Sequence, residues 1–120
     1  SWSDAQMAGG GYNVIIHEFA HKLDMLNGDS DGIPPLPPGI SRKEWEQTLL
    51  AAYEDFCIRV NNAEEQGEDT QIDPYAAENP AEFFAVMSET FFETPGFLRV
   101  EYPALYNNLC LFYRQTPATR

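Results

Sequence analysis

Long apolar runs are absent from this 120-residue sequence, and so is a leader in which charged residues precede apolar ones. No stretch approaches the ~18 uninterrupted apolar residues that a membrane-spanning helix needs. Cysteine is scarce as well, and the spacing of Cys57 and Cys110 indicates no disulfide framework. Because reduced thiols are typical of cytosolic proteins, the sequence predicts a soluble, cytoplasmic protein without a membrane partner.

Basic residues are also few. Seven lysines and arginines stand against 19 aspartates and glutamates, which gives a formal charge of -12. A negative field of this size repels nucleic acid phosphates and anionic membrane surfaces. Direct binding of nucleic acid is therefore disfavoured, whereas a basic partner or substrate stays compatible with the charge.

Strand signals are weak throughout, so the apolar residues that are present point to helices. They make up 43% of the chain, enough for one domain over residues 1–120 with a core of its own. The chain starts at Ser1 and enters a helix within about a dozen residues, so we expect the C-terminal part of a longer polypeptide. The fold class is mainly α, and it becomes α+β if a preceding part adds strands.

Capping residues and apolar periodicity predict four helices. After the glycines at 9–11, Asn13 is a helix cap for a largely buried helix. Ser41 and Glu44 form a capping box, and Asn79 followed by Pro80 is typical of a helix start. The predicted helices run from Val14 to about Leu26, from Ser41 to between Asn62 and Glu65, from Pro80 to about Glu93, and from Tyr102 or Pro103 to Tyr113.

The only two histidines of the chain lie four residues apart in the first of these helices. The stretch His17-Glu18-Phe19-Ala20-His21 matches H-E-x-x-H, in which two imidazoles project from one helix face and can bind one metal ion. Glu18 falls roughly 100° around the helix. From there its carboxylate can reach a water molecule beside the metal, which is the place of a general base. The motif predicts two ligands and a base.

Catalytic zinc is held by three protein groups, so a third ligand is needed. Asp24 shares the histidine face but lies roughly 10 Å along the helix from His17, too far to bind the same ion. It is either a partner that hydrogen-bonds a histidine ring or a surface carboxylate. Glu82 on the helix from Pro80 has two interpretations that its spacing does not separate, a metal ligand or a capping-box glutamate. Glu89 is either exposed or bonded to a histidine of the site.

A resemblance to the Mlc titration factor A family extends over nearly the whole chain. It is carried by HEFAHKLDMLNG at 17–28, by DPYAAENPAE at 73–82 and by the helix at 83–92. That family consists of zinc metallopeptidases of the gluzincin kind, with a site similar to the catalytic domain of anthrax lethal factor. The resemblance implies that His17, His21 and Glu82 bind Zn²⁺ and that Glu18 is the general base.

The similarity to lethal factor also implies a catalytic role for Tyr75, seven residues before Glu82, as a donor to the oxyanion of the reaction. Lethal factor has a further carboxylate where this chain has Val86. The partner of the histidine rings therefore stays open between Asp24 and Glu89.

The function implied is aminopeptidase-like hydrolysis of peptide or protein substrates. An alternative is a regulatory protein that sequesters a transcriptional repressor, with peptidase activity secondary. A structural zinc site is a third interpretation, but it requires a fourth protein ligand, and no third histidine or nearby cysteine supplies one.

Overall fold

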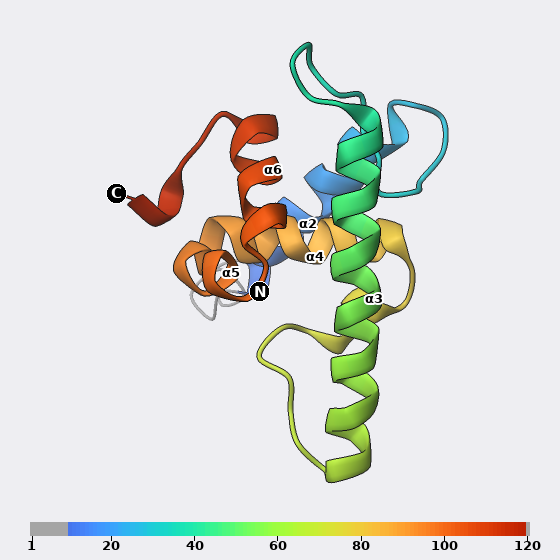
Figure 1. The fold of residues 1–120 in the computed structure, drawn as a ribbon, viewed down its shortest axis with the longest axis vertical. Coiled ribbons are helices and arrows are strands. Elements are labelled where there is room, and N and C mark those ends of the chain that lie inside the picture. Colours follow the sequence, from blue (N-terminus) through green and yellow to red (C-terminus); the bar gives the residue numbers. More distant parts are fainter. Residues whose placement is uncertain (1–9, 120) are drawn as a thin grey trace.

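The computed structural model describes residues 10–119, and over this range the chain is helical without a strand. A long helix α3 runs from Arg42 to Gln66, and α4 from Pro80 to Glu93 crosses it (Figure 1). The helices in chain order are α2 (Gly10–Met25), α3, α4, α5 (Pro95–Glu101) and α6 (Pro103–Tyr113), with 3₁₀ turns η1 (Pro74–Ala77) and η2 (Pro117–Thr119). The predicted mainly α fold class is confirmed.

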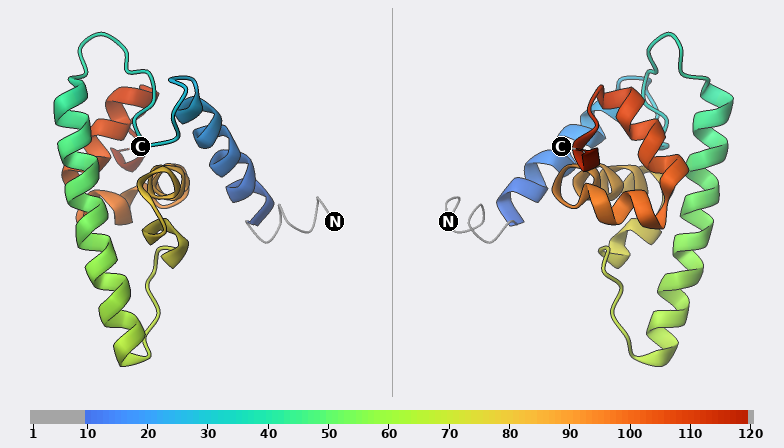
Figure 2. Two further views of the ribbon diagram at one scale, coloured as in Figure 1. Left: turned by 90° about the vertical axis from the view of Figure 1, so that its right-hand side faces the viewer. Right: turned by 60° about the vertical axis from the view of Figure 1, so that its left-hand side comes forward.

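Helix α4 forms the centre of the domain. It lies between α2 on one side and α3 on the other (Figure 2). Eight of its side chains are buried, among them Phe83, Phe84 and Phe91. Trp45 of α3 packs edge to face on Phe84, with ring centroids 6.1 Å apart. Two of its carboxylates, those of Glu82 and Glu89, contact histidines of α2.

The predicted helix ends agree with the structure where a side-chain cap sets them. The Oγ of Ser41 accepts a hydrogen bond from the Glu44 N–H at 3.2 Å, and the Oδ1 of Asn79 accepts one from the Glu82 N–H at 2.9 Å. Pro80 and Pro103 occupy first-turn positions of α4 and α6, where a missing N–H costs nothing. Helix α3 continues past Glu65 to Gln66, because Gly67 in a left-handed conformation ends it.

Three expectations were wrong. Helix α2 begins at Gly10, so Asn13 lies inside it and is not its cap, while Gly9 falls outside the described residues. The four predicted helices leave out α5, which runs from Pro95 to Glu101 directly after α4. The motif helix is also not largely buried, because Phe19 is 58% exposed. Its exposed large apolar side chains are those of Val14, Ile15, Phe19 and Met25.

Tertiary packing gives α2 one buried face and one exposed face. Of its described side chains, only those of Ala20 and Asp24 are fully buried. Sequence periodicity cannot tell an apolar face that meets the core from one that is exposed. No helix within residues 10–119 has the length and apolar character needed to cross a membrane.

Gly32, in the turn after α2, has a backbone conformation and surroundings that only glycine fits. Its φ is +83°, and an added Cβ would lie 2.7 Å from Leu49 Cδ2 and 2.8 Å from the Pro80 carbonyl oxygen. We expect Gly32→Ala to lower the free energy of unfolding by about 3 kcal/mol, from left-handed strain together with overpacking. Urea denaturation measures this change.

Two other glycines provide matched controls for the strain. Gly28 and Gly39 have φ values of +94° and +97°, yet an added Cβ would meet nothing within 4 Å. Their replacement by alanine is expected to cost about 1 kcal/mol, from the backbone alone. Equal losses at all three positions would contradict the packing argument for Gly32.

Candidate metal centre

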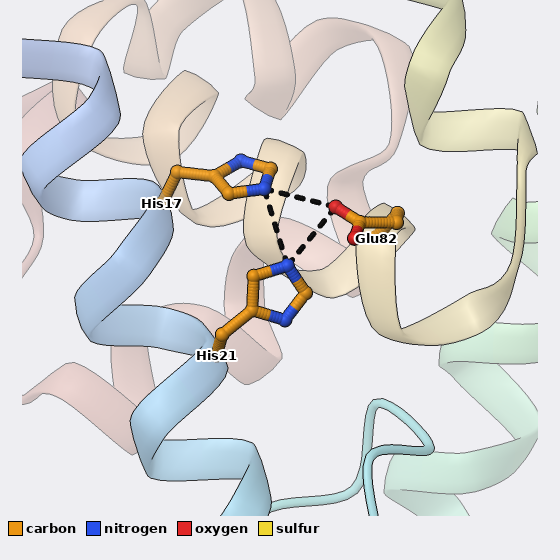
Figure 3. A group of neighbouring side chains, drawn as sticks. All are labelled: His17, His21 and Glu82. Carbon is orange, nitrogen blue, oxygen red and sulfur yellow. Dashed lines mark hydrogen bonds and ion pairs between the residues drawn. The ribbon is translucent and has the colours of Figure 1, made fainter.

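Two histidines of α2 and one glutamate of α4 converge on one point (Figure 3). The Oε1 of Glu82 lies 2.9 Å from His17 Nε2 and 3.0 Å from His21 Nε2. The two Nε2 atoms are 3.1 Å apart. The histidines meet because residues four apart share a helix face, and Glu82 meets them because α4 packs across α2 at its first turn.

The direction of the Glu82 side chain separates the two interpretations that spacing left open. Its backbone N–H donates to the Asn79 side chain, so the residue does take part in the helix cap. Its carboxylate, however, faces His17 and His21. The backbone of Glu82 and its side chain thus serve different purposes, and the carboxylate is free to act as a ligand.

The donor set fits a divalent transition metal. Two imidazole nitrogens and a carboxylate oxygen are the usual ligands of such ions in metallopeptidases. Ligands at about 2.0–2.1 Å from a tetrahedral ion lie about 3.3 Å from one another. The separations of 2.9 to 3.1 Å found here need only a small outward adjustment. His17, His21 and Glu82 could therefore hold a metal ion.

Glu89, two turns further along α4, is the partner of the His17 ring. Its Oε1 forms a short hydrogen bond with His17 Nδ1. Burial raises the pKa of the Glu89 carboxyl, and the bond to His17 partly offsets this effect. An acceptor at Nδ1 places the ring proton there and leaves Nε2 with a lone pair directed at the converging donors.

Asp24 has neither of the two roles considered for it. Its side chain is 0% exposed, so it is not a surface carboxylate. It does not bond a histidine ring but accepts hydrogen bonds from the N–H of Gly32 at 2.8 Å and of Asp31 at 3.4 Å. Burial raises the pKa of this carboxyl, and the two backbone donors lower it by a smaller amount. Residues 28–32, which are glycine, aspartate and serine, indicate a turn after α2, and both backbone donors to Asp24 belong to this turn.

The two remaining candidate residues, Glu18 and Tyr75, are exposed. Glu18 is exposed on α2 next to His17. Tyr75 is 51% exposed in η1, where Asp73 Oδ1 accepts a hydrogen bond from its backbone N–H at 3.0 Å. The negative charge of Glu82 is the main cause of a raised pKa for the Tyr75 phenol. Tyr75 therefore interacts electrostatically with Glu82, one of the three residues that could hold a metal ion.

An H-E-x-x-H helix that packs its two histidines against a glutamate of a second helix has the arrangement of a metallopeptidase centre. The chain belongs to the family of glucose-regulated metallo-peptidases M90, whose sequence profile matches residues 1–114. The resemblance stated from the motifs is thereby confirmed.

Similar proteins include two bacterial relatives called Mlc titration factor A, one from Yersinia pestis strain Pestoides F and one from Yersinia pseudotuberculosis serotype O:1b. Each is 42% identical to this chain over 126 aligned residues. The alignment covers 100% of the chain and 44% of each relative, so the chain spans less than half the length of these proteins.

Proposed function

We propose that the chain is the catalytic domain of a zinc metallopeptidase of the gluzincin kind, in which His17, His21 and Glu82 bind Zn²⁺. The observation that carries the proposal is the convergence of these three side chains on one point. When bound, the ion would act as a Lewis acid that lowers the pKa of water to about 7 and polarises a carbonyl group. Within residues 10–119 the group has three members, which favours an open fourth position over a structural site.

We assign roles to three other residues of the site. Glu18, exposed beside His17, takes the proton of the attacking water and passes it to the leaving amine. Tyr75, exposed near Glu82, donates its phenol hydrogen to the oxyanion. Glu89 holds the His17 ring in the tautomer that binds metal.

The proposed reaction is aminopeptidase-like hydrolysis of short peptides in the cytoplasm. The side chains of His17, His21 and Glu82 are partly exposed, which is compatible with access by a substrate. Several carboxylates lie around it, and Asp73 and Glu93 are close enough to raise the pKa of Glu89. A positively charged amino terminus is compatible with this environment.

A second proposed function is binding of a repressor protein. The relatives carry the name Mlc titration factor A, which describes the titration of Mlc. We propose that the full-length protein binds such a repressor, in addition to hydrolysing peptides. The chain's charge of -12 makes direct competition for nucleic acid an unfavourable mechanism, so the contact would be between proteins.

Metal removal tests the proposed peptidase function. We expect about one zinc ion per chain, loss of hydrolysis after chelation, and recovery when Zn²⁺ is added back. Metal analysis and a panel of aminoacyl amides, free peptides and amino-blocked peptides measure these outcomes. Hydrolysis that survives complete removal of the metal would contradict the proposal, as would a protein that binds no metal at all.

A further inference from the structure

Asp24 is an anchor of the helix that carries the two histidines. Apart from Ala20, it is the only fully buried described side chain of α2. An alanine offers little contact area, and the opposite face of α2 is exposed. Among the described residues the donors to this carboxylate are two backbone N–H groups, the closer being that of Gly32 at 2.8 Å. This bond therefore helps to set the position of α2, in addition to the contacts that His17 and His21 make with Glu82 and Glu89 of α4.

Gly32, which donates to Asp24, also contacts helices α3 and α4. Its carbonyl oxygen accepts a hydrogen bond from Trp45 Nε1 of α3 at 3.0 Å. Its Cα packs against the first residue of α4 so closely that an added Cβ would lie 2.8 Å from the Pro80 carbonyl oxygen. The peptide groups around Gly32 are thus held by α2, α3 and α4 together.

The two residues that Gly32 contacts, Asp24 and Pro80, each lie close in sequence to proposed metal ligands. Asp24 lies three residues after His21 on α2, and Pro80 lies two residues before Glu82 on α4. Metal–ligand distances tolerate errors of only about 0.2 Å. A small shift of α2 against the start of α4 would therefore separate the Glu82 carboxylate from the two imidazoles.

We propose that Asp24 is a positioning residue, which through Gly32 fixes α2 against the start of α4 and so sets the distance between the histidines and Glu82. The inference rests on the proposed metal centre, but it does not depend on the chain's hydrolysing peptides. This positioning role requires a hydrogen-bond acceptor at position 24, but it does not require a negative charge there.

The test compares Asp24→Ala, which removes the acceptor, with Asp24→Asn, which keeps one oxygen for the Gly32 N–H. Leu109→Ala, which empties a fully buried position on α6, is the control for lost stability. For each folded protein, Zn²⁺ affinity is measured by competition with a chromophoric chelator. The visible spectrum with Co²⁺ reports the ligand geometry. If Asp24→Ala does not fold, Asp24→Ser, whose shorter side chain cannot reach Gly32, takes its place.

We expect Asp24→Ala to lower Zn²⁺ affinity about 10- to 100-fold and to change the Co²⁺ spectrum, as substitutions next to metal ligands do. Asp24→Asn should stay within about threefold of wild type, and Leu109→Ala should lose stability without losing affinity. Unchanged affinity in the acceptor-free variant would overturn the inference while leaving the metal centre intact. An equal loss in Leu109→Ala, or no rescue by Asp24→Asn, would overturn it as well. A wild-type protein that binds neither metal would overturn both proposals.

Discussion

Glu18→Gln is expected to lower kcat for peptide hydrolysis by about 100- to 10,000-fold while zinc remains bound, since this is the usual contribution of a general base. Glu18 lies outside the group formed by His17, His21 and Glu82, so its loss removes no ligand. An amide has nearly the same shape as a carboxylate but cannot take a proton from water at neutral pH. Steady-state kinetics and metal analysis on the same preparations measure both quantities.

A matched control separates the role of Glu18 from the loss of one negative charge. Glu54→Gln makes the same change at an exposed position of α3 and should leave kcat within about twofold of wild type. Equal turnover by wild type and Glu18→Gln would remove Glu18 from the mechanism. If repressor binding survives in Glu18→Gln, the binding function does not depend on hydrolysis.

Glu82→Ala is expected to weaken zinc binding by more than about 100-fold and to abolish hydrolysis, because it removes one of three ligands. The structure also gives Glu82 a place in the first turn of α4, where its N–H donates to Asn79. Alanine keeps that N–H, so the helix cap should persist. Chelator competition and the free energy of unfolding of the metal-free protein together test this expectation.

The reciprocal variant is Asn79→Ala, which removes the cap and keeps the carboxylate. It should cost about 1 kcal/mol of stability and change zinc affinity by less than about tenfold. Glu82→Ala should thus lower mainly the zinc affinity, and Asn79→Ala mainly the free energy of unfolding. A large stability loss with unchanged affinity in Glu82→Ala would instead assign the Glu82 side chain to capping.

Local signals predicted the helices well where a side chain fixes an end. Ser41 and Asn79 cap their helices as their sequence neighbours indicate, because a cap involves atoms only a few residues apart. The start of α2 was predicted wrongly, since asparagine after glycine resembles a cap, yet the helix continues back to Gly10. The exposure of Phe19 was also missed, because it depends on which elements pack against α2 and not on the periodicity of α2 itself.

The motif by itself determined which two histidines share a helix face and that Glu18 lies beside that face, because helix geometry fixes positions within one turn. Only the tertiary structure decided which carboxylates meet them. It turned Glu82 toward His17 and His21, placed Glu89 at the far nitrogen of His17, and buried Asp24 against Gly32. These choices depend on how α4 crosses α2 and on the turn that joins α2 to the rest of the fold. The contacts of His17 with Glu82 and Glu89 join residues that are distant in the chain, and spacing within a helix carries no information about them.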